Sequence, residues 1–86
     1  MAVKPFGEFV ASTHPISTSN ADRILGALLV TDQQGRPEWI DIQYQTADGQ
    51  TFHQVRMDYL NGMFLLSCLR AIQLETGFEM PEDTRL

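Results

Sequence analysis

The chain has 86 residues, of which 43% are hydrophobic and 20% are charged, and its formal net charge is −5. This length and composition fit one small globular domain with a single core, and they argue against a disordered or membrane-spanning chain. The negative charge opposes attraction to nucleic acid or anionic lipid, and the arginines are scattered. We therefore expect no membrane partner and no direct nucleic-acid binding.

Residues 1–7 contain a proline and a glycine and are expected to form a loose tail. This start lacks the charged and apolar regions of a signal peptide, and the single cysteine, Cys68, fits a reducing compartment. We therefore expect a cytoplasmic protein. Residues 8–12 are a candidate short strand, and residues 13–22, rich in Ser, Thr and Asn, are expected to form a loop.

Residues 24–31, with the sequence ILGALLVT, are apolar on both of their alternating faces. This pattern is typical of a strand that is covered on both sides, so it predicts a strand in the middle of a sheet. A short helix remains the alternative because Leu and Ala favour helices, although Gly26 and the flanking turn residues favour the strand.

A β-hairpin is predicted from residue 39 to residue 57. Residues 39–46 alternate between apolar and polar side chains, and Asp48 and Gly49 follow them. Asp-Gly favours a type I′ turn, because both central residues of that turn need a positive φ.

This turn sets the register of the hairpin. It places Ile42 opposite Val55 on one face, and Asp41 opposite Arg56 on the other. An opposite-charge cross-strand pair contributes about 0.2–1 kcal/mol. We expect the apolar face to contact a helix.

Two aromatic residues, Trp39 and Phe52, fall on the other, more polar face of this hairpin. One interpretation is that an N-terminal segment containing Phe6 or Phe9 covers them. The other is that they belong to an interface with a partner, since aromatic residues within a polar rim are typical of interfaces.

The longest apolar segment runs from Asp58 to Gly77 and predicts a helix. Asp58 suits the N-cap, and Gly77 suits the left-handed residue that ends a helix. The stripe expected to face the sheet consists of Leu60, Phe64, Leu65, Cys68, Ala71 and Ile72.

The opposite side of this helix is also largely apolar, which predicts a homodimer, because one small sheet covers only one side of a helix. In that dimer Gly62 would admit a second helix, with Arg70 and Gln73 at the rim. A dimer through Trp39 and Phe52 is the competing arrangement. The interface candidates on the helix are Tyr59, Gly62, Met63, Leu66, Arg70, Gln73 and Leu74.

The predicted fold class is α+β, with an antiparallel β-meander of three to four strands and one C-terminal helix packed across it. The whole chain, residues 1–86, is expected to be a single domain. Residues 79–86 are short and acidic and are expected to form a second loose tail.

No set of side chains suggests catalysis or metal binding. His14, His53 and Cys68 lie far apart in the sequence and lack the paired spacing of a zinc site. Cys68 lies on the predicted core stripe, ten residues from the helix N-terminus that would lower its pKa. The sequence therefore predicts a non-enzymatic protein with no catalytic residue, no metal site and no cofactor.

Several short motifs follow one another along the chain. They are THP at 13–15, YQT at 44–46, GQT at 49–51, and ETG at 75–77, which closes the helix opened by Asp58. In these motifs the chain resembles the BssS-type family of small biofilm regulators, whose members run from a THP segment through strands to one C-terminal helix. The resemblance implies a small bacterial or phage-borne regulatory protein that acts through other macromolecules, and it supplies no catalytic residues.

The leading functional hypothesis is a regulatory or adaptor protein that works through protein–protein contacts, with another protein as its target. The two-sided apolar helix and the absence of assembled chemistry motivate it. The alternative is a phage-type inhibitor of a host defence or nucleic-acid enzyme, because small size and negative charge suit that role equally well.

Overall fold

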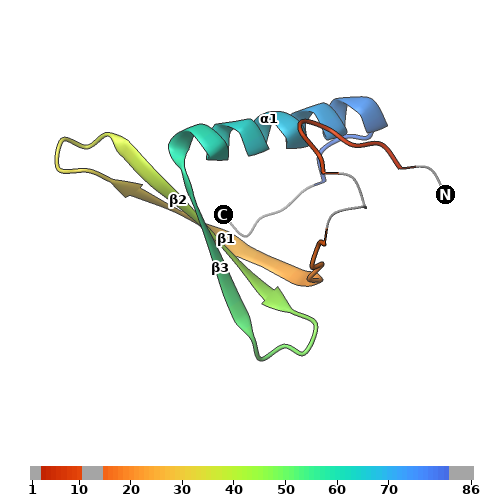
Figure 1. Cartoon of the computed structure of the whole chain (residues 1–86), viewed down its shortest axis with the longest axis horizontal. Coiled ribbons are helices and arrows are strands. Elements are labelled where there is room, and N and C mark those ends of the chain that lie inside the picture. The colour runs from red at the N-terminus through yellow and green to blue at the C-terminus, as the bar shows by residue number, and fades with distance from the viewer. Residues whose placement is uncertain (1–2, 11–14, 82–86) are drawn as a thin grey trace.

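The computed structural model describes residues 3–10 and 15–81, and it confirms the α+β class. Three strands, β1 (Ala21–Thr31), β2 (Pro37–Thr46) and β3 (Phe52–Asp58), form an antiparallel sheet in the order β1-β2-β3. One helix, α1 (Tyr59–Thr76), follows directly and packs against β2 and β3 (Figure 1). Residues 8–10 of the candidate N-terminal strand lie outside any strand, and residues 11–12 lie outside the described residues.

Two aspartates organise the turns of the meander. Asp32, between β1 and β2, accepts hydrogen bonds from the backbone N–H groups of Gln34 and Arg36, both at 2.9 Å. Asp48, between β2 and β3, accepts from the backbone N–H of Gln50 at 2.9 Å and from that of Thr51 at 3.1 Å. Each turn is therefore held by a carboxylate that satisfies backbone donors.

The register predicted for the β2–β3 hairpin is confirmed, but the predicted turn type is wrong. Ile42 pairs with Val55, and Asp41 pairs with Arg56. Among the described residues only glycines have a positive φ, with Gly49 at 73°, so the residue before it cannot adopt the type I′ geometry. The Asp48 carboxylate stabilises a different turn that keeps the same strand pairing.

The prediction that residues 24–31 form the middle strand is wrong, because β1 is an edge strand and β2 lies in the middle. Both faces of β1 are apolar, yet Leu28 and Leu29 are 59% and 58% exposed. The apolar residues on both faces of β1 predict that both faces are buried, but they do not predict which element packs against them. No described part of this chain buries Leu28 or Leu29.

The rotation of α1 also differs from the prediction. Leu60 is 78% exposed and Phe64 is half exposed, so of the predicted stripe only Leu65 lines the crevice that faces the sheet. Gly62 is buried instead, directly against the side chain of Ile40 on β2. The sheet-facing crevice is lined by Ile40, Ile42, Met57, Gly62, Met63, Leu65, Leu66 and Leu69.

The residues at the start of α1 explain this rotation. Asp58 ends β3 and is also the N-cap of α1, accepting from the backbone N–H of Asn61 at 2.8 Å. Strand and helix are therefore joined without a linker, and this junction sets which side of α1 meets the sheet. Periodicity could not identify that side, because α1 is apolar nearly all round.

The N-terminal segment lies against α1. Lys4 forms an ion pair with Glu75 at 2.6 Å, and Gly7 lies against Phe64 and Cys68. Residues 3–7, expected as a loose tail, therefore cover part of the stripe that was expected to face the sheet.

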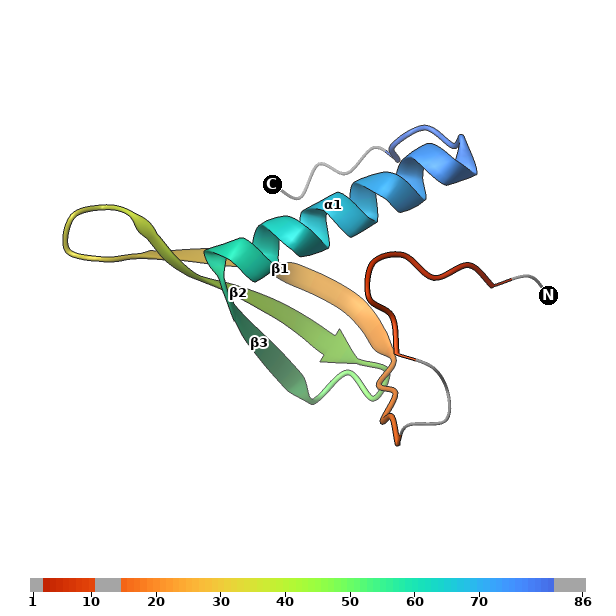
Figure 2. The same ribbon diagram turned by 45° about the horizontal axis from the view of Figure 1, so that its top comes forward.

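The described residues contain no buried apolar side chain. Five half-buried ones gather where the first half of α1 meets β2 and β3, namely Ile40, Ile42, Met57, Met63 and Leu65. The second half of α1 diverges from the sheet (Figures 1 and 2). The accessible surface of the chain is 7825 Å², whereas a folded monomer of this mass exposes about 5,100 Å². Its radius of gyration is 15.2 Å, against about 12 Å for a compact domain.

We expect Gly62→Val to lower the free energy of unfolding by about 1–3 kcal/mol, because a Cβ at this position would overlap Cδ1 of Ile40 and the larger side chain would force Ile40 to move. Gly26→Val is the matched control, since a Cβ there meets no atom within 4 Å and valine favours strands. Urea midpoints at one protein concentration measure both. Equal midpoints for the two variants would contradict the packing of α1 on β2.

Candidate functional site

Two exposed surfaces of the sheet are candidates for protein contact. The outer face is the side of the sheet away from α1, and the helix side is the side toward it. Alternation along each strand assigns residues to these faces. The outer face carries Leu25, Leu28, Trp39, Asp41, Gln43, Phe52 and Arg56, and the helix side carries Ile24, Ala27, Leu29, Ile40, Ile42, Val55 and Met57.

A bidentate ion pair lies on the outer face. Nε of Arg56 donates to Oδ1 of Asp41 at 2.7 Å, and Nη2 of Arg56 donates to Oδ2 at 2.8 Å. The sequence suggested an exposed pair, but only 1% of the Asp41 surface is accessible, whereas half of the Arg56 side chain is. The guanidinium also lies 5.8 Å from the ring centre of Trp39, within the range of a cation–π contact.

This pairing shifts the titration of both groups. The hydrogen bonds from Arg56, and then its charge, hold the pKa of the Asp41 carboxyl below its ordinary value despite the opposing effect of burial. The same contacts raise the pKa of Arg56. Both groups are charged at neutral pH, and Arg56 uses two of its five N–H donors on Asp41.

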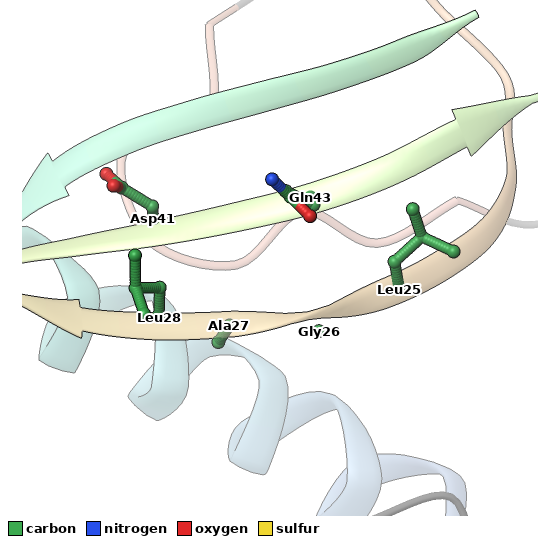
Figure 3. A pocket seen from close by; sticks show the side chains of 6 residues that line it. All are labelled: Leu25, Gly26, Ala27, Leu28, Asp41 and Gln43. Atoms are coloured by element: carbon green, nitrogen blue, oxygen red, sulfur yellow. The ribbon is translucent and has the colours of Figure 1, made fainter.

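A shallow hollow of about 270 Å³ lies beside this pair, between β1 and β2 (Figure 3). A β-bulge between Ile24 and Gly26 opens it, and the side chains of Leu25 and Leu28 form its wall (Figure 3). The polar side chains along it have partners within the chain, since Asp41 is bound by Arg56 and the amide of Gln43 donates to Gln54 at 2.7 Å. Such a hollow suits an apolar side chain better than a polar small molecule.

The two aromatic interface candidates do not form one patch. Trp39 pairs with Asp58 at one end of the β2–β3 ladder, and Phe52 pairs with Gln45 at the other. Six residues of strand separate them, which is about 20 Å. Because the N-terminal segment contacts α1, neither Phe6 nor Phe9 gives the expected cover, and Phe52 remains 65% exposed.

The helix candidates divide into two groups. Gly62, Met63 and Leu66 line the crevice toward the sheet, so the position predicted to admit a second helix is occupied by Ile40. Tyr59, Arg70, Gln73 and Leu74 lie outside that crevice, and Nη1 of Arg70 donates to Gln73 at 2.5 Å.

The remaining chemistry-bearing residues are dispersed. His53 stacks on Tyr44 with ring centres 5.1 Å apart, Cys68 is a free, partly exposed thiol, and His14 lies outside the described residues. The described part of the chain contains no group of three or more His, Cys, Asp or Glu side chains placed to hold a metal ion. Within the same residues, no helix combines the length and apolar character that crossing a bilayer requires.

No protein-family model, curated protein or solved structure matches the chain. The similarity of its short motifs to BssS-type regulators therefore stays an expectation.

The outer-face ion pair leads to a pH-dependent prediction for Arg56→Met. Because the pKa of Asp41 is lower in the folded chain, its carboxylate adds stability above about pH 4, its unfolded pKa. This contribution is lost as the pH falls through the folded pKa. Removing Arg56 leaves a buried carboxylate without its partner, so the gap in urea midpoint between wild type and variant should be wider at pH 7 than at pH 3.

Arg36→Met is the matched control for this measurement. Arg36 also binds an aspartate, Asp32, at 3.1 Å, but both of these groups lie in an exposed turn. The pKa of Asp32 is lowered first by the backbone N–H of Arg36, which the substitution leaves in place. The Arg36→Met gap should change less with pH, and a gap for Arg56→Met that is the same at both pH values would refute the role of Arg56.

Proposed function

We propose that this protein is a small, non-enzymatic regulatory or adaptor protein that acts in the cytoplasm through protein–protein contacts, as a homodimer. One observation carries the proposal: the chain exposes 7825 Å², and none of its described apolar side chains is buried. The excess over a folded monomer of this mass is about 2,700 Å². Obligate homodimers bury roughly 2,000–5,000 Å² in total over both chains, so this excess is enough for a second copy and leaves area for a target.

The distribution of the exposed residues supports the same proposal. Large apolar side chains are exposed on the helix side, on the outer face and on α1. Single exposed apolar residues are common on protein surfaces, but three surfaces that each carry several of them indicate binding sites. The Asp41–Arg56 pair beside Trp39, with its carboxylate buried and its guanidinium half exposed, resembles the centre of an interface, where Arg and Trp are enriched. The regulatory class is also what the similarity to BssS-type proteins implies.

The dimer is tested on the purified chain. Light scattering after size exclusion should give twice the 9.7 kDa of one chain, and the thermal midpoint should rise with protein concentration. A folded monomer whose midpoint is independent of concentration would overturn the homodimer.

The adaptor role is tested by using the purified chain to capture a target protein from bacterial lysate. Trp39→Ala is the matched control, and this variant should fail to capture the target. Recovery of a sensor or transcription factor supports a regulator. Recovery of a nuclease or a defence complex supports instead the phage-type inhibitor. Turnover of a small molecule by the pure protein would contradict both.

A further inference from the structure

We infer that the second copy sits on the helix side, with α1 of each chain lying over β1 of the other. This inference rests on the proposed homodimer and assigns it a surface. The open surface on this side comprises Ala27 and Leu29 of β1, Val55 of β3, and Leu66 and Leu69 of α1.

These residues form one apolar surface. Leu29 pairs with Ile40 and Ala27 pairs with Ile42, so the side chains of β1 continue the row that begins in the crevice under α1. The crevice has a volume of about 220 Å³ and is lined only by apolar residues and a glycine. No charged side chain lies in this set, so a contact here places no like charges of the two copies directly against each other.

The α1 helix of the same chain does not cover β1. No Cα of α1 comes within 8 Å of a Cα of β1. Asp58 joins β3 to α1 with no linker, and Gly62 is in contact with Ile40, so α1 is held over β2 and β3. Moving it over β1 would break both contacts.

No other described segment of the chain covers β1 at Leu29 either. The N-terminal segment contacts the flank of α1 that carries Phe64 and Cys68, and Leu29 is 58% exposed with that segment in place. Among the described residues, this face of β1 at Leu29 is therefore left open to a second molecule.

A second copy fits this surface because the chain carries both halves of the contact. β1 is a sheet edge without a helix, and α1 has a flank at Leu66 and Leu69 that β2 and β3 leave half exposed. A two-fold axis beside β1 places each flank over the other chain's strand, which is the self-complementary arrangement of an isologous interface.

Two neighbouring leucines provide the test. Leu29 lies on the helix side and Leu28 on the outer face, and they are almost equally exposed. Leu29→Glu should weaken the dimer at least about 30-fold, the effect of losing an interface hot spot, whereas Leu28→Glu should leave the dissociation constant unchanged. Sedimentation equilibrium measures both.

If Leu29→Glu does not fold, a disulfide cross-link tests the same interface. In a Cys68→Ser background, Leu29→Cys with Leu66→Cys should give a covalent dimer in oxidised glutathione. Since a disulfide needs Cα atoms within about 7 Å, these two cysteines cannot join within one chain. The control pair, Leu28→Cys with Leu66→Cys, should remain uncross-linked.

The results of these experiments distinguish a failure of this inference from a failure of the homodimer proposal. A wild-type monomer at all concentrations would overturn both, and would indicate that a different protein occupies the helix side. A wild-type dimer that Leu28→Glu disrupts and Leu29→Glu does not would overturn only the inference, and would assign the dimer to the outer face.

Discussion

The junction between β3 and α1 determines the rest of this structure. Asp58 is at once the last residue of the strand and the N-cap of the helix, and one turn later Gly62 lies against Ile40. With no linker to act as a hinge, the helix leaves the sheet in one direction only, over β2 and β3. As a consequence β1 has no helix above it, and the second half of α1 has no sheet below it (Figure 2).

The two sides of the sheet are chemically different, and this separates their roles. The crevice on the helix side is lined only by apolar residues and a glycine, which suits a permanent contact between identical chains. The outer face carries a half-exposed ion pair, an aromatic ring and a row of glutamines, which suits a contact that forms and dissociates. If the helix sides face each other, each dimer presents two outer faces, and a target with two copies of its own site would bind both with increased avidity.

The sequence predicted those features of the fold that local chemistry decides. The Asp48-Gly49 turn and the alternation of β2 predicted the register of the hairpin, and Asp58 and Gly77 predicted the ends of α1. The position of β1 and the rotation of α1 were predicted wrongly, because both elements are apolar on two sides and a single-chain argument assumes that the same chain covers them. The burial of Asp41 was missed for a related reason, since strand alternation assigns a charged residue to solvent without accounting for its neighbours.

The order of the strands has a kinetic consequence. β1, β2 and β3 are neighbours in the sheet in the same order as in the chain, and two tight turns and a direct junction connect all four elements. Such a topology has a low contact order, so the meander and helix can form in a fast unimolecular step. Covering β1 with a second copy is then second order. Productive assembly therefore competes with non-specific pairing of β1 edges, and the yield of refolding depends on how the chain is diluted.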